Sequence, residues 1–144
     1  MSKKYTLLID ESGDQGLERV MTHEQPFGAS SYLTMGAVLV PTTLLPSVRE
    51  QLDGVRSKLG VTQLHCTDMN HLNVAYLAKT MSRLRILAFG VISKKSTLGD
   101  YRKMIEGKKQ AQDYYNKCSQ YLFELVAMFC SEHGLGSADI EILF

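Results

Sequence analysis

The sequence has little of what marks a secreted or membrane protein. It contains three cysteines, and the apolar run that follows Lys3 and Lys4 already ends at Asp10. That run is too short for the core of a signal peptide, and no later run approaches the roughly 20 residues of a membrane span. Cys118 and Cys130 lie about 18 Å apart on one predicted helix, too far to bridge each other. An odd number of scattered cysteines predicts a reducing compartment, so we expect a cytoplasmic protein without a membrane partner.

The sequence also lacks a charge imbalance. Sixteen Lys and Arg residues stand against 15 Asp and Glu residues, which gives a formal net charge of +1. The overall charge therefore gives no argument for nucleic acid as a partner, and any basic surface must be local. A hydrophobic content of 44% is enough for a core, and 144 residues fit a single domain over 1–144.

A short apolar run that ends in a group of acids opens the chain. Tyr5–Ile9 has the pattern of a buried strand, and Asp10, Glu11 and Asp14 follow it closely. Carboxylates fixed at the end of a core strand can bind a hard cation such as Mg²⁺. The alternative is a polar turn that only closes the strand, since Asp, Ser and Gly are common turn residues.

The rest of the chain alternates strand and helix patterns. Residues 13–31 carry no convincing period and predict a long loop. Arg19, His23 or Glu24 could reach a substrate from it; the alternative is a solvated, mobile loop. We predict strands at 32–40, 84–93 and 139–144, and helices at 42–59, from Asp68 or Asn70 to about Ser82, and at 110–133. The last helix places Ala111, Tyr114, Cys118, Tyr121, Leu122, Leu125 and Phe129 on one wide core face. This order predicts an α/β domain with a mixed β-sheet flanked by helices.

Four segments together resemble the family known as domain of unknown function 3800. They are Asp10–Asp14 after the apolar strand, Tyr32–Pro41, Gln63–Cys66 and Phe89–Lys95. The resemblance implies a bacterial or phage protein with a ribonuclease H-like fold. It also implies further acidic and helical sequence beyond Phe144, so we expect that the C-terminal part of the domain is missing; a frayed edge strand is the alternative.

The same resemblance implies one or two Mg²⁺ or Mn²⁺ ions held by carboxylates that converge from different segments. Asp10 is the leading ligand and catalytic residue. Glu11 can join it only if the chain turns immediately after Asp10, because successive side chains of a strand point to opposite faces. Ser12 and Gly13 would allow such a turn, and Asp14 is the fallback ligand.

His65 has two interpretations. It could serve the catalytic site as a ligand, proton shuttle or phosphate contact, or it could satisfy a loop hydrogen bond. Gln63 stands where the family usually has an acid, which counts against full activity. Asp68 could replace that acid as a metal ligand, or it could cap the following helix.

One local concentration of positive charge follows the third predicted strand. It comprises Lys94, Lys95, Arg102, Lys103, Lys108 and Lys109, with Asp100 and Glu106 among them. Phosphate backbones are attracted to such clusters. We predict nucleic-acid binding by Lys94, Lys95, Arg102 and Lys103; the alternative is a solvated surface.

The sequence leaves three functions open. The leading hypothesis is a metal-dependent nuclease or related phosphodiesterase, with Asp10 holding the metal and His65 assisting. The alternatives are a catalytically weakened module that keeps the fold and binds nucleic acid or is associated with phage or defence, and an oligomerising scaffold. Fold alone does not decide between them.

Overall fold

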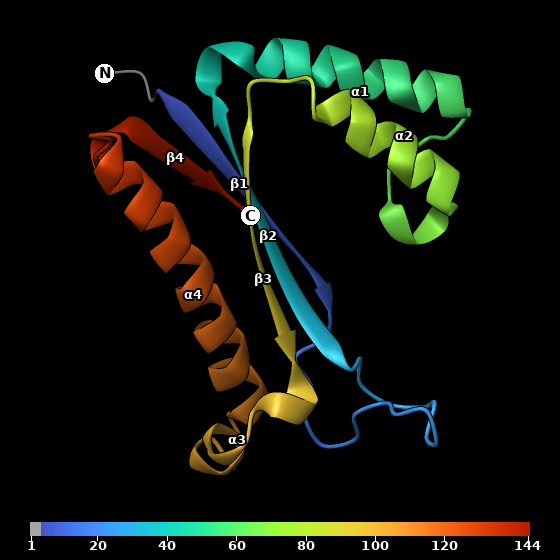
Figure 1. Ribbon diagram of the computed structural model, residues 1–144, viewed down its shortest axis with the longest axis vertical. Helices are drawn as coiled ribbons and strands as arrows, with labels where there is room; N and C mark the ends of the chain where they lie inside the picture. The colour runs from blue at the N-terminus through green and yellow to red at the C-terminus, as the bar shows by residue number, and fades with distance from the viewer. Residues whose placement is uncertain (1–3) are drawn as a thin grey trace.

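The computed structural model describes residues 4–144 as one β-sheet with helices on both of its faces (Figure 1). The strands are β1 (Tyr5–Gly13), β2 (Tyr32–Pro41), β3 (Leu87–Lys94) and β4 (Ile140–Leu143). The helices are α1 (Leu45–Leu59), α2 (His71–Met81), α3 (Asp100–Met104) and α4 (Gln110–Glu132). None of the helices in this part of the chain is both long enough and apolar enough to cross a membrane.

The sheet is mixed, with the strand order β3-β2-β1-β4. β2 runs antiparallel to both β1 and β3, and β4 runs parallel to β1. A parallel neighbour requires a long crossover, and α4 provides it between β3 and β4. The prediction of an α/β fold with a mixed sheet and flanking helices is therefore confirmed.

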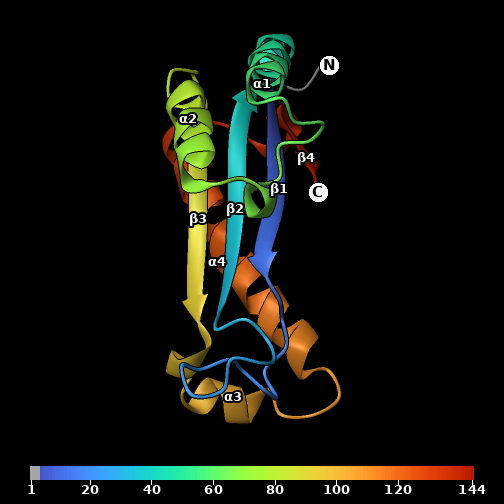
Figure 2. The same cartoon turned by 90° about the vertical axis from the view of Figure 1, so that its right-hand side faces the viewer.

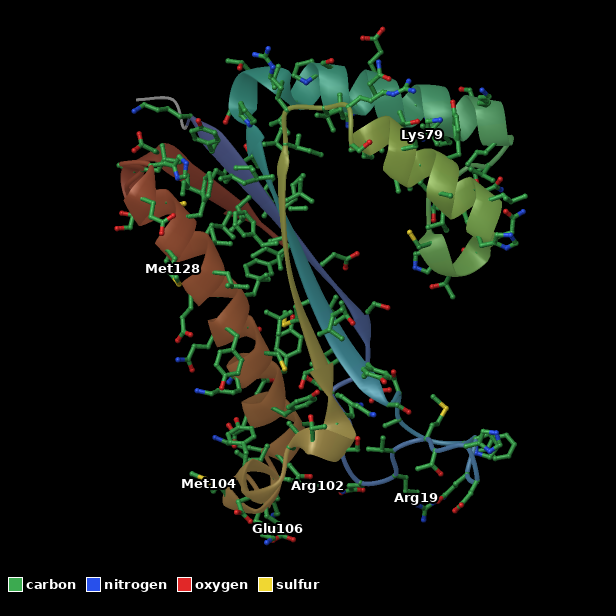
Figure 3. The ribbon with its side chains drawn as sticks, viewed as in Figure 1. Arg19, Lys79, Arg102, Met104, Glu106 and Met128 are labelled. Carbon is green, nitrogen blue, oxygen red and sulfur yellow. The ribbon has the colours of Figure 1, made fainter. Side chains whose placement is uncertain are left out.

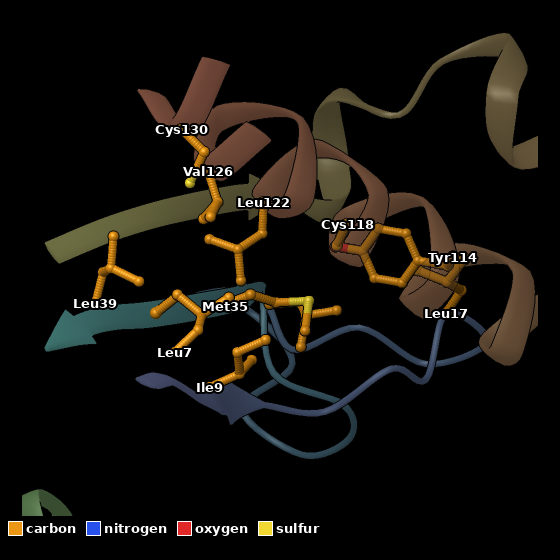
Figure 4. Packing of buried hydrophobic residues seen from close by; sticks show 12 residues of the cluster. Leu7, Ile9, Leu17, Met35, Leu39, Tyr114, Cys118, Leu122, Val126 and Cys130 are labelled. Carbon is orange, nitrogen blue, oxygen red and sulfur yellow. The ribbon is translucent and has the colours of Figure 1, made fainter. Parts of the chain in front are cut away.

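One face of the sheet packs against α4 and forms the core (Figure 4). Alternate residues of the central strands point to this face, so Leu7, Met35 and Leu39 are almost fully buried and surround Leu122 of α4. On α4 the buried residues recur at every fourth position: Tyr114, Cys118, Leu122, Val126 and Cys130. The predicted wide face is wrong in two places, because Tyr121 and Leu125 are 48% and 42% exposed. Both residues lie outside the stripe of every fourth residue along which α4 is buried.

The other face of the sheet is only partly covered. Figures 1 and 2 place α1 and α2 over the end of the sheet where β2 leaves and β3 begins. The underside of α1, the connector to α2 and Leu8 of β1 line a hollow of about 810 Å³. Towards the other end no helix covers this face within residues 4–144, and Ile92 of β3 is 74% exposed there. We call this uncovered surface the open face.

The helix ends follow the predicted signals. Gly60 ends α1 in the left-handed conformation at φ 65°, where its N–H reaches the carbonyls of the last turn. The Asn70 side chain accepts a hydrogen bond from the Asn73 N–H at 3.0 Å and caps α2, so Asn70 and not Asp68 is the cap. The short helix α3 lies in the polar stretch for which the sequence predicted no element. β3 begins at Leu87, three residues later than predicted.

Candidate functional site

The turn after Asp10 that Glu11 would need in order to join Asp10 in one site does not form, because β1 continues to Gly13. Asp10 pairs with Gly36 of β2 and Glu11 pairs with Met35, without a bulge between them. The two carboxylates therefore leave opposite faces of the sheet. Asp10 shares the open face with Leu8, whereas Glu11 faces α4, where the Tyr115 hydroxyl donates to Glu11 Oε2 at 3.4 Å. The expectation that both acids join one site is wrong for this reason.

Two glycines lie beside Asp10 on the open face. Gly36 pairs with Asp10 on one side and with Gly90 on the other, so the three residues form a row across the sheet. A methyl group at either glycine would lie 3.8–3.9 Å from its nearest neighbouring atom, which is an ordinary contact distance. Packing within the described residues therefore does not require glycine here. The result is a bare backbone floor next to an exposed carboxylate, as found where a ligand approaches a strand closely.

His65 and Asp68 lie on the connector between α1 and α2. Their side chains are 66% and 79% exposed and pair with each other, with Nδ1 and Oδ2 3.2 Å apart. Gln63 lines the hollow under α1 together with Leu8. Within residues 4–144, no three His, Cys, Asp or Glu side chains come close enough together to hold a metal ion. The predicted set of Asp10, Glu11 and Asp68 is thus not assembled into one site.

Asp14 is held in place by three donors. The N–H groups of Gly16 and Ser30 donate to its two oxygens at 2.8 and 2.6 Å, and Lys95 Nζ donates at 3.2 Å. Burial raises the pKa of Asp14, but these hydrogen bonds and the Lys95 charge outweigh it, and the pKa falls below its ordinary value. The Lys95 side chain is completely buried. Asp14 and Lys95 therefore form an ionic clamp that fixes the long loop to the end of β3, and the Lys95 ammonium does not lie on the surface.

The loop between β1 and β2 is well ordered by hydrogen bonds. Ala29 N–H donates to the Arg19 carbonyl at 2.6 Å, and Met21 N–H donates to the Ala29 carbonyl at 2.8 Å. Gly28 is required where the two segments meet: its φ is +133°, and a Cβ there would lie 2.2 Å from the Arg19 carbonyl oxygen. Residues 19–29 therefore form a small closed loop, held at its base by a parallel bridge between Val20 and Ala29. We call it the bridged loop.

The bridged loop, the end of β3 and α3 surround a pocket of about 540 Å³. Its charged lining residues are four cations and one acid: Arg19, Lys94, Lys95, Arg102 and Glu18. Tyr32 also lines it. We call it the basic pocket. An adjoining hollow of about 660 Å³ shares Arg102 and adds Lys103 and Lys108, with Glu18 and Glu106 as the acidic members. Figure 3 shows Arg19, Arg102 and Glu106 at the same end of the molecule, far from Lys79.

All four predicted nucleic-acid-binding residues, Lys94, Lys95, Arg102 and Lys103, thus line adjoining hollows, but the Lys95 side chain is buried. Arg102 also supports the loop, because its guanidinium donates to the Leu17 carbonyl. Lys103 pairs with Asp100 at 2.9 Å on the exposed surface of α3. Arg19 is distant from the other cations in the sequence, and the fold of the bridged loop places it in the lining of the basic pocket.

Comparison of the chain with protein-family models, with curated proteins and with solved structures found no match. The resemblance to the domain of unknown function 3800 family therefore stays a prediction from short motifs. Any functional argument must come from the geometry of the open face and the basic pocket.

Proposed function

We propose that this chain is a ribonuclease H-like domain that binds the phosphate backbone of nucleic acid in the basic pocket. The observation that carries the proposal is the convergence of three cations from three separate segments on one pocket: Arg19, Lys94 and Arg102. Cations outnumber the single acid Glu18 in the lining, and a surplus of one sign of charge attracts ligands of the opposite sign. Phosphate is the anion for which planar guanidinium groups and flexible ammonium groups are both suited.

Two of these cations are available to a ligand. Within the described residues, the side chains of Arg19 and Lys94 are exposed and form no ion pair or hydrogen bond. Lys103, by contrast, is paired with Asp100. Because the formal net charge is only +1, this local concentration is the main electrostatic attraction that the chain offers to a polyanion.

The sheet supports the finer fold assignment. β1 lies inside the sheet between antiparallel β2 and parallel β4, and it carries the acids of the motif on which the resemblance rests. A bacterial or phage origin and a cytoplasmic location belong to the same proposal.

Binding of labelled DNA and RNA oligonucleotides, followed by fluorescence anisotropy, tests the proposal. The variant Arg19→Gln/Lys94→Gln removes two free cations and is expected to weaken binding at least tenfold. The matched control Lys79→Gln/Arg83→Gln removes two exposed cations from the α2 region at the opposite end of the molecule and is expected to bind like wild type. Equal loss in both double variants would contradict a defined site.

Metal-dependent cleavage is the second candidate, and the open face favours it. Asp10 lies on a rigid interior strand beside the glycine floor, where a phosphate group could come close. The described residues do not supply a full set of metal ligands. Mg²⁺ is often held by one or two carboxylates together with substrate phosphates, so Asp10 is the residue that would hold Mg²⁺ or Mn²⁺ there.

The cleavage hypothesis has a separate test. Labelled DNA and RNA are incubated with the protein and Mn²⁺, and the products are separated by electrophoresis. Cleavage that is absent in Asp10→Asn and retained in Glu11→Gln is expected, since Glu11 lies on the other face. Cleavage that Asp10→Asn leaves unchanged would exclude Asp10 as the metal ligand.

A further inference from the structure

We infer that the nucleic acid bound here is single-stranded, with its phosphates in the basic pocket and its bases stacked on Phe27 and Tyr32. The inference rests on the proposed function and adds the substrate class. It follows from two exposed aromatic rings: Tyr32, which lines the pocket and pairs with Lys94 across the sheet, and Phe27, which lies on the same bridged loop as Arg19.

The first ring is that of Phe27, which precedes Gly28 in the bridged loop. It is 81% exposed and takes no part in the buried core of the described residues. The backbone beside it is held in place, because Gly28 packs directly against the Arg19 carbonyl and the Ala29 N–H donates to the same oxygen. The bridged loop thus carries both an exposed apolar ring and the Arg19 cation.

The second ring is that of Tyr32, the first residue of β2. Tyr32 is 44% exposed and lines the basic pocket. It is the direct cross-strand partner of Lys94, so the ring and the ammonium leave neighbouring strands on the same face of the sheet. Tyr32 and Lys94 therefore form a pair of aromatic ring and cation that lines the basic pocket.

Cations that track the backbone and rings that stack on successive bases are the two parts of a single-strand binding surface. In a duplex the faces of the bases are stacked on one another, and exposed rings have nothing to contact except at the ends. The aromatic rings therefore distinguish the two forms of nucleic acid, whereas Arg19, Lys94 and Arg102 alone would not.

The open face offers a path for the bound nucleic-acid strand. Tyr32 and Lys94 lie on the same face as Gly36, Gly90 and Asp10, because residues two apart along a strand share a face. Gly36 lies four positions after Tyr32 along β2, a path of about 13 Å at roughly 3.3 Å per residue. A strand anchored in the basic pocket would therefore extend over Ile92 and the glycine floor towards Asp10.

The test measures binding of fluorescein-labelled oligo-dT and oligo-U and of DNA and RNA duplexes of equal length. The wild-type protein is expected to bind the single strands at least tenfold more tightly than the duplexes. Phe27→Ala is expected to weaken single-strand binding by about 5- to 150-fold, the range for loss of one base-stacking contact. Tyr32→Ala is expected to act similarly, and Tyr32→Phe to restore binding because it keeps the ring.

Phe144→Ala is the matched control. Phe144 is 82% exposed, as Phe27 is, but it follows β4 at the far edge of the sheet and contacts Phe123. It is expected to bind like wild type. Thermal unfolding of each variant checks that the protein remains folded.

The outcomes separate this inference from the proposed function. If Arg19→Gln/Lys94→Gln weakens binding while Phe27→Ala and Tyr32→Ala do not, or if duplexes bind as tightly as single strands, the single-strand inference is overturned and backbone binding stands. If no nucleic acid binds, both fall. Phe27-dependent binding to vesicles of phosphatidylserine and phosphatidylcholine, without nucleic-acid binding, would show a membrane surface and also overturn both.

Discussion

At the scale of single residues, the ionic clamp between Asp14 and Lys95 decides how the loop is held. Lys95 is buried with its ammonium against Asp14, whereas Asp14 is half exposed and also has two backbone donors. The two partners are therefore unequal. Removing the acid leaves a buried charge without its partner, and removing the lysine leaves a carboxylate that water and backbone amides still satisfy.

We predict that Asp14→Asn destabilises the protein by about 1–3 kcal/mol, the usual range for a buried polar group left unsatisfied. Lys95→Met is expected to cost less, because methionine fills the same apolar channel without a charge. Equilibrium unfolding in urea measures both, and the double variant completes a cycle. A larger loss in Lys95→Met than in Asp14→Asn would show that the ammonium has partners other than Asp14.

The pH dependence of the clamp follows from the direction of the Asp14 pKa. The pKa is below its ordinary value of 3.8 in the folded protein, so the ionised carboxylate stabilises the fold. This contribution is complete above the ordinary pKa and is lost as the pH falls through the lowered value. The stability difference between wild type and Asp14→Asn is thus expected to shrink below about pH 4. A difference that stays constant down to pH 2 would contradict this assignment.

At the scale of secondary-structure elements, α4 carries the core through one narrow stripe. Leu122 is fully buried against β1 and β2, whereas Leu125, less than one turn away, is 42% exposed. The two leucines are chemically identical and lie on the same helix, so they form a matched pair.

We predict that Leu122→Ala destabilises the protein by about 2–5 kcal/mol through lost burial and the cavity left behind. Leu125→Ala is expected to stay within about 0.5 kcal/mol of wild type. Urea unfolding of the two variants measures the difference. Equal effects would mean that Leu125 is covered in solution by a surface outside residues 4–144.

The elements also show what a single sequence can predict. Periodicity found β1, β2, α1, α2, α4 and β4, and Gly60 and Asn70 marked helix ends correctly, because these signals are local. The end of β1 is not local. Asp10 to Gly13 are turn-forming residues, but β2 offers a continuous ladder of partners as far as Leu33, and pairing across the sheet outweighs the local preference.

At the scale of the whole molecule, the positions of the acids and cations depend on tertiary structure. The sequence predicted the cluster around Lys94 and Arg102, because its members are close to one another in the chain. Arg19 lies near them only because of the fold of the bridged loop. The buried Lys95 ammonium has Asp14, which is distant in sequence, as its partner. A site with both Asp10 and Glu11 required a turn after Asp10, and the sheet has three more ladder pairs in place of that turn.

The salt dependence of single-strand binding tests the central claim most directly. Dissociation constants for oligo-dT are measured from 50 to 300 mM NaCl for wild type, Arg19→Gln/Lys94→Gln and the control Lys79→Gln/Arg83→Gln. Each phosphate neutralised on a single strand contributes about 0.7 to the slope of log K against log salt concentration. The slope is predicted to fall by about 1.4 in the pocket variant and to stay unchanged in the control. An unchanged slope in the pocket variant would contradict phosphate binding in the basic pocket.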